Sequence, residues 1–175
     1  MTKNEAGVVV KMISTFYPNE FTKTTPEQMK YIVEMWAATC ERYRPEQVTA
    51  ALQQFMATDL KGYAPKPGQL INLIAAPEDD HDLNEGEAWN LILKAVSNGI
   101  YGAEDEYSRL PELLQKAVGS SFIIHEMAMR EVTSVDESNF KRNYRTVLER
   151  ERLKRRMPPS TWKRLAGGER EVLPG

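Results

Sequence analysis

Few residues of this chain have the types and spacing that catalysis or metal binding would need. One cysteine and two histidines are present, at Cys40, His81 and His125, too few for a cysteine–histidine zinc site. A thiol nucleophile paired with a histidine is formally possible, but Cys40 belongs to an apolar helical stripe, where cysteine is usually a small core residue. His125 stands among isoleucine and methionine residues, so we expect it to be structural.

Motifs for phosphate or cofactor chemistry are missing as well. The sequence has no G-x-x-x-x-G-K-[ST] and no G-x-G-x-x-G pattern. The acidic run EDDHD, residues 78–82, could hold a cation loosely, but it lacks rigid ligand spacing and is more typical of a solvated acidic linker. We therefore expect no cofactor, no metal, no small-molecule substrate and no enzymatic activity.

A strongly basic segment near the C-terminus is the charged feature with a definite pattern. Residues 141–156 contain eight basic side chains and two acidic ones. Helical spacing places Phe140, Tyr144 and Leu148 on one apolar face, and glutamates can pair with arginines one turn away. Three interpretations stay open: a solubilising surface helix, a nucleic-acid footprint on which Tyr144 or Trp162 stacks with bases, and a docking site for an acidic protein.

Charge is segregated along the chain, although the net charge is only −2. Residues 1–76 are net +1, residues 77–140 net −10 and residues 141–175 net +7. Segregation of this kind predicts two electrostatically different surfaces. No apolar run approaches the roughly 20 residues of a membrane span, and no signal peptide is evident. With a single cysteine, these features favour a cytoplasmic protein.

Helical periodicity predicts an all-α fold. A first helix is expected over about 5–16, with Val9, Met12, Ile13 and Phe16 on its buried face. A second helix should begin after Thr25, which with Pro26 and Gln28 forms an N-terminal capping box, and a third should begin at Pro45.

The stretch GYAPKPGQLINLI, residues 62–74, enters a fourth helix through two prolines. Proline restricts the residue before it to extended conformations, so residues 63–66 should form a stiff strap that leads into a helix starting at Pro67. One interpretation is a rigid connection that packs a short helix on the first three. The other is a recognition surface formed by Tyr63, Pro65 and Lys66.

The second half predicts another helical module. Asn84 with Glu87 should cap a helix whose buried face is Trp89, Ile92, Leu93 and Val96. Ser120 is expected to cap a later helix, and Ser134 with Glu137 the longest one, from about Val135 to Arg156. The expected organisation is two small helical bundles, 1–76 and 85–157, joined by an acidic linker, 77–84; the second ends in a long basic helix, and a flexible basic tail, 158–175, follows.

A family resemblance follows from these patterns. The spaced residues Trp36, Tyr43-Arg44-Pro45, Val48, Ala51-Leu52 and Phe55, followed by YAPKPGQLINLI, resemble the N-terminal helical domain of bacteriophage replicative-helicase loader/inhibitor proteins. The segments AWNLILKAVSNGIYGAEDEYSRLPELLQKAVGSS and SNFKRNYRTVLERE are similar to a module in replication proteins of phages that infect Gram-positive bacteria.

This resemblance implies a non-enzymatic adaptor that binds the hexameric replicative DNA helicase, restrains it and delivers it to an initiator-bound origin. The family's C-terminal part is regarded as flexible and helicase-contacting, whereas residues 85–157 here are expected to be ordered. A phage-encoded protein of this kind would act in the host bacterial cytoplasm.

We expect two partner surfaces. The second of them, suited to the initiator, comprises Tyr63, Pro65 and Lys66. The alternatives are a small DNA-binding accessory protein that uses the basic helix on single-stranded or forked DNA, and a structural or host-interaction protein. The expected helicase contact comprises Tyr144, Arg145, Leu148, Arg152, Arg155 and Trp162.

Overall fold

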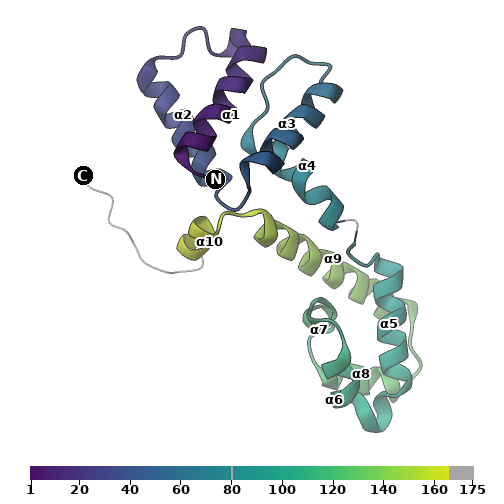
Figure 1. Cartoon of the computed structure of the whole chain (residues 1–175). Helices are drawn as coiled ribbons and strands as arrows, with labels where there is room; N and C mark the ends of the chain where they lie inside the picture. The colour runs from purple at the N-terminus through teal and green to yellow at the C-terminus, as the bar shows by residue number, and fades with distance from the viewer. Residues whose placement is uncertain (80, 166–175) are drawn as a thin grey trace. The chain divides into compact units, whose positions relative to one another are not determined.

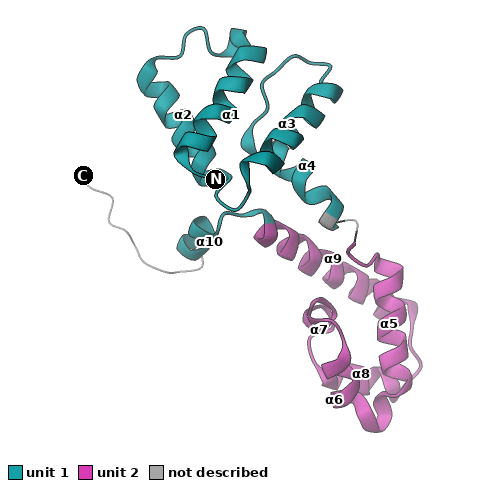
Figure 2. Cartoon of the chain, viewed as in Figure 1, with its two compact units in different colours: residues 1–80, 156–175 teal, residues 81–155 magenta. Residues whose placement is uncertain are grey.

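The computed structural model describes residues 1–79 and 81–165, and every regular element within them is a helix (Figure 1). The all-α prediction is confirmed. The chain forms two compact units: unit 1 contains residues 1–80 and 156–175, and unit 2 contains residues 81–155 (Figure 2). Among the described residues, no helix combines the length and apolarity that a membrane crossing requires.

The helices of unit 1 begin where the sequence places its capping residues and prolines. Thr25 and Gln28 form the expected capping box, and prolines occupy the first positions of several helices. These elements are α1 (Lys3–Phe16), the 3-10 turn η1 (Pro18–Glu20), α2 (Pro26–Thr39), α3 (Pro45–Thr58), α4 (Pro67–Asp79) and α10 (Pro159–Leu165).

The core of unit 1 lies where α1 packs on α2 and α3, and where α3 packs on α4. Phe16 does not join this core as predicted, because it lies at the end of α1 and is 59% exposed. The buried apolar residues are Ala6, Val9, Val10, Ile13, Trp36, Ala37, Cys40, Tyr43, Val48, Ala51, Leu52, Leu70 and Ile71.

Unit 2 is built around close contacts between α6 and α8. A Cβ atom on Gly99 would lie 3.0 Å from Ile124 and 3.1 Å from Ala128, so glycine permits this close approach. Leu93, expected in the core, is 37% exposed, because Ile92 takes the buried position. The helices are α5 (Glu85–Ser97), α6 (Gly99–Arg109), α7 (Glu112–Val118), α8 (Ser121–Ala128) and α9 (Ser134–Arg156).

The core of unit 2 joins α5 to α9 through aromatic rings. The ring of Phe140 on α9 lies 5.5 Å from that of Trp89 on α5 and 5.9 Å from that of Tyr144. Asn84 and Glu87 form the predicted capping box at the start of α5. The side chain of Ser120, by contrast, makes no capping hydrogen bond.

Element boundaries differ from the expected ones around the linker and the tail. Helix α4 continues through Pro77 to Asp79, because proline removes one hydrogen bond without preventing helical dihedral angles. Within the expected tail, residues 159–165 form α10, with proline at its first position. Residues 166–175 of that tail lie outside the described residues. The division into domains, linker and flexible tail stays a prediction.

Candidate interaction surfaces

The basic side chains of α9 are held by acidic residues at and just before the start of α5. Arg145 donates to both carboxylate oxygens of Glu85, at 2.8 and 3.1 Å. Arg152 and Arg155 both donate to Oδ2 of Asp82, at 2.8 and 2.7 Å. The three arginines predicted to bind a partner are thus already engaged in ion pairs inside unit 2.

These ion pairs keep the carboxylates charged at neutral pH. Partial burial alone would raise the pKa of Asp82, but the hydrogen bonds and positive charge of Arg155 and Arg152 outweigh it and lower that pKa. Hydrogen bonds from Arg145 lower the pKa of Glu85. In unit 1, Arg156 forms an ion pair with Asp79.

Tyr144, predicted to be a partner contact, is a core residue. Its side chain is fully buried, and its hydroxyl donates to the carbonyl oxygen of Leu83 at 2.7 Å. Burial satisfies both parts of the side chain, the ring by packing and the hydroxyl by a hydrogen bond. Leu148 is half-buried against the same core. The predicted apolar face of α9 therefore points into unit 2.

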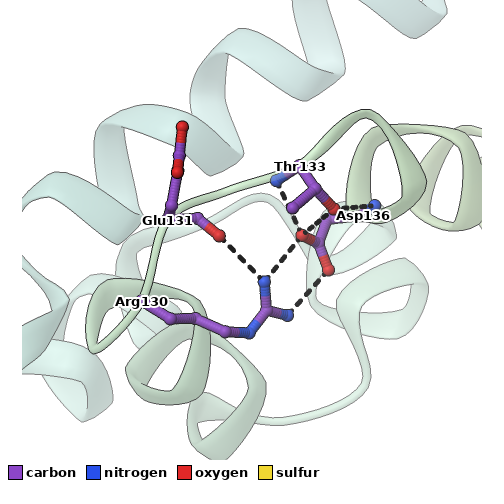
Figure 3. Close-up of polar contacts among 4 residues, drawn as sticks. All are labelled: Arg130, Glu131, Thr133 and Asp136. Atoms are coloured by element: carbon purple, nitrogen blue, oxygen red, sulfur yellow. Dashed lines mark hydrogen bonds and ion pairs between the residues drawn. The ribbon is translucent and has the colours of Figure 1, made fainter.

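The N-terminus of α9 is fixed by a cluster of side chains that begins before the predicted cap (Figure 3). Asp136 accepts hydrogen bonds from the backbone and hydroxyl groups of Thr133, both at 2.8 Å, and from both terminal nitrogens of Arg130, also at 2.8 Å. Arg130 and then Thr133 hold the pKa of Asp136 well below its ordinary value. Thr133 is thus the capping residue instead of Ser134.

The signal for this cap was present one residue earlier in the sequence. Thr133 and Asp136 have the same i, i+3 spacing as the predicted pair of Ser134 and Glu137. Glu137 instead pairs with Lys141 at 2.5 Å, one turn along α9. The arginine that completes the cluster comes from the loop after α8, which helical spacing could not reveal.

The strap is tied down along its length and leaves one aromatic side chain exposed. Gly62 precedes it with a positive φ of 71°, and the backbone N–H of Ala64 donates to Glu20 at 2.6 Å. Tyr63 is 68% exposed and Lys66 is exposed. Pro65 is buried, so its place on the predicted second surface is corrected: it packs inward and does not face a partner.

An apolar groove at the end of the strap was missed by sequence reasoning. Its volume is about 470 Å³, and Pro67 and Gly68 form one wall. Tyr31 and Met35, exposed by 68% and 63%, lie one turn apart on α2 and form the other. Their i, i+4 spacing outside the main apolar stripe of α2 is the signal that could have indicated the groove.

Trp162 lies on α10 in unit 1 and is half-buried. The same helix contacts the end of α2 through Ser160, whose hydroxyl donates to the Glu41 carboxylate at 2.6 Å. The hydrogen bond from Ser160 lowers the pKa of Glu41. Trp162 therefore belongs to a different unit from the arginines with which it was grouped.

The residues considered for chemistry have structural surroundings. Cys40 is fully buried, and burial raises the pKa of its thiol to about 11, which leaves almost no reactive thiolate at neutral pH. Nδ1 of His125 lies 3.3 Å from the carbonyl oxygen of Gly99. Within residues 1–79 and 81–165, no group of three or more potential metal ligands gathers.

A helical fold with exposed apolar and internally paired charged surfaces defines a class of protein that works by binding other macromolecules. Residues 1–71 match the family model of a phage helicase loader/inhibitor protein's N-terminal domain, which is not a catalytic domain. The match covers α1 to α3 and the beginning of α4. No curated protein and no solved structure matches the chain.

Proposed function

We propose that this protein is a replication adaptor that binds the hexameric replicative helicase, restrains it and delivers it to an initiator-bound origin. The observation that carries the proposal is the match of residues 1–71 to a helicase loader/inhibitor domain, since the four helices concerned form the core of unit 1. An adaptor of this kind acts by binding energy alone, by preferring one state of the helicase over another.

The helicase contact that we propose uses the exposed parts of Arg145, Arg152 and Arg155 on α9. The side chain of Arg145 is 61% exposed, and those of Arg152 and Arg155 are 31% and 37% exposed. Tyr144 and Leu148 support these arginines from the core side. Trp162 on α10 would contribute a separate aromatic contact.

The second proposed surface is the exposed part of the strap, for the initiator protein. Tyr63 and Lys66 lie at its two ends, and both are exposed. A stiff backbone lowers the entropy lost when a partner binds, because the strap does not have to be ordered first. The apolar groove of Tyr31 and Met35 would extend this surface.

Size-exclusion chromatography with light scattering tests the proposed function. The full chain is mixed with a hexameric replicative helicase, with and without a non-hydrolysable ATP analogue. Co-elution as a complex of defined mass is expected. Failure to co-elute in both nucleotide states contradicts the proposal.

Neutralising the arginines tests the proposed contact itself. The triple variant Arg145→Gln, Arg152→Gln and Arg155→Gln should lose co-elution while its helical circular dichroism is kept. The variant Lys94→Gln with Arg109→Gln removes positive charge elsewhere in unit 2 and should bind as the unaltered chain does. Equal binding by all three proteins would exclude α9 from the contact.

Single-stranded or forked DNA is the second candidate partner. The excess of basic over acidic residues on α9 favours it, since eight basic and four acidic side chains lie within Ser134–Arg156. Binding to a labelled oligonucleotide should then weaken steeply with salt, in proportion to the phosphates contacted. DNA binding without helicase binding would replace the adaptor proposal with this one.

A further inference from the structure

Residues 82–85 lie along α9 within unit 2 and contact it at three points. Asp82 binds Arg152 and Arg155, the carbonyl oxygen of Leu83 accepts from Tyr144, and Glu85 binds Arg145. The last two contacts join a core side chain and an adjacent ion pair. The contact of Asp82 differs, because two arginines converge on one of its oxygens.

Arg152 and Arg155 present their guanidinium groups as a site for an oxyanion. They lie three residues apart on one face of α9, and their nitrogens reach Oδ2 of Asp82 at 2.8 and 2.7 Å. Convergent, charge-assisted hydrogen bonds from arginine are the usual way in which proteins bind carboxylate and phosphate groups. Asp82 thus occupies the position that an anionic group of a partner would take.

An open pocket gives a partner access to this site. The pocket has a volume of about 260 Å³ and is lined on one side by Asp82 and Arg155 and on the other by Lys116 and Leu113 of α7. The side chain of Asp82 is only 14% exposed, whereas those of Arg155 and Lys116 are 37% and 42% exposed. An incoming anion can therefore meet both cations before Asp82 leaves.

The pocket favours a protein carboxylate over a nucleic-acid backbone. Glu112 and Glu151 also line it, and both pair with Lys116, at 2.8 and 3.1 Å. These two acids repel a strand that carries a negative charge at every nucleotide more than a peptide with separated charges. Leu113 adds an apolar contact that a peptide side chain can use.

We propose that Lys116, Arg152 and Arg155 form a binding site for acidic side chains of a partner protein, and that Asp82 is its internal competitor. The choice of a protein partner rests on the proposed adaptor function. In the free chain Asp82 fills the site, and binding requires its displacement. The affinity of the partner is then reduced by the fraction of molecules in which Asp82 has left.

The variant Asp82→Asn tests this competition, with a labelled oligo-glutamate peptide as the probe and fluorescence anisotropy as the readout. Removing the competing charge should raise the affinity of the full-length chain for the peptide roughly tenfold. Asp105→Asn makes the same charge change on α6, and Glu149→Gln removes a neighbouring acid on α9. Neither of these two acids lines the pocket, and each substitution should change affinity by less than about twofold.

Further arms separate the possible outcomes. Adding Arg152→Gln and Arg155→Gln to Asp82→Asn should abolish the gain. An equal gain in all three single variants would overturn the proposal, as would a gain for labelled oligo-thymidine in place of oligo-glutamate. If Asp82→Asn does not fold, the side-chain N–H signals of Arg152 and Arg155 in the unaltered protein provide the test: they should shift on addition of oligo-glutamate, and unchanged signals would refute the site.

Because the probe is a peptide and not a helicase, this test is independent of the adaptor proposal. Gain of peptide binding by Asp82→Asn without any helicase complex would retain the site and reject the proposed function. A helicase complex whose stability is unaffected by Asp82→Asn, together with unchanged peptide binding, would do the reverse.

Discussion

At the scale of single residues, polar side chains in this protein mainly fix the positions of helices. Thr133 and Asp136 define the first turn of α9, and Tyr144 fastens the middle of that helix to Leu83. Each forms hydrogen bonds that water would otherwise supply, so each net contribution is modest. Their removal has measurable and different consequences.

Replacing the helix cap distinguishes Thr133 from its neighbour. Thr133→Ala should lower the free energy of unfolding by about 1 kcal/mol, because the first turn of α9 loses its capping hydroxyl. Ser134→Ala, at the position that the sequence favoured, should change it by less than about 0.5 kcal/mol. Urea denaturation followed by circular dichroism measures both. A larger effect at Ser134 would mean that the cap is assigned to the wrong residue.

The same cluster predicts how stability depends on pH. The pKa of Asp136 is lower in the folded protein than in the unfolded chain, so its contribution to stability is fully present above the unfolded value of about 3.9. This contribution is lost as pH falls toward the folded pKa. Asp136→Asn should therefore flatten the loss of thermal stability between neutral and acid pH. An unchanged acid profile for this variant would contradict the assignment.

Tyr144→Phe separates the core role of this residue from the predicted surface role. The variant keeps the ring but leaves the carbonyl oxygen of Leu83 without its hydroxyl partner, which should cost about 1 kcal/mol of stability. Chemical denaturation measures the loss. An exposed binding residue would show no such loss, so unchanged stability would restore the surface interpretation.

At the scale of elements, the strap shows how a short stretch of chain fixes the start of a helix. Gly62 turns the backbone, Glu20 binds the backbone of Ala64, and Pro67 opens α4. The prolines therefore place the first turn of α4 beside α2, where Pro67 and Gly68 form the wall of the apolar groove.

Two glycines at the ends of the strap should respond in opposite ways to alanine. Gly62→Ala should destabilise unit 1 by about 1 kcal/mol, because φ is +71° there and an alanine side chain disfavours that conformation. Gly68→Ala should stabilise it by about 0.5 kcal/mol, because the residue is helical and no atom lies within 4 Å of the added Cβ. Thermal unfolding of both variants gives the comparison. Equal signs would show that Gly62 does not hold the turn.

At the scale of the whole molecule, two separate cores predict two cooperative units. Leu52 belongs to the core of unit 1 and Ile92 to that of unit 2, and both are almost fully buried. Each core contains its own tryptophan, Trp36 and Trp89. Opening of one unit then exposes only its own buried groups.

Thiol labelling of Cys40 reports the opening of unit 1 directly, because this cysteine is buried in its core. Leu52→Ala should cost about 2–5 kcal/mol and accelerate labelling roughly 30-fold or more. Ile92→Ala creates a similar cavity in unit 2 and should leave the labelling rate nearly unchanged. Equal acceleration by both variants would show that the chain unfolds as one cooperative unit.

The sequence by itself determined the helices and most of their buried faces. Periodic apolar residues and local caps are short-range features, so α2, α3 and α5 begin at the predicted residues. Phe16 and Leu93 were misassigned, because helical spacing defines a face but does not say where its contact with the rest of the core ends.

Only the tertiary structure decided which charged and aromatic residues face solvent. The sequence brought Tyr144 and the arginines of α9 together as one surface, but the fold turns the ring inward and supplies Asp82 and Glu85 from a segment some 60 residues earlier in the chain. It also buries Pro65 and joins α2 to the start of α4 in one groove. Contacts between distant segments depend on packing, which local patterns do not encode.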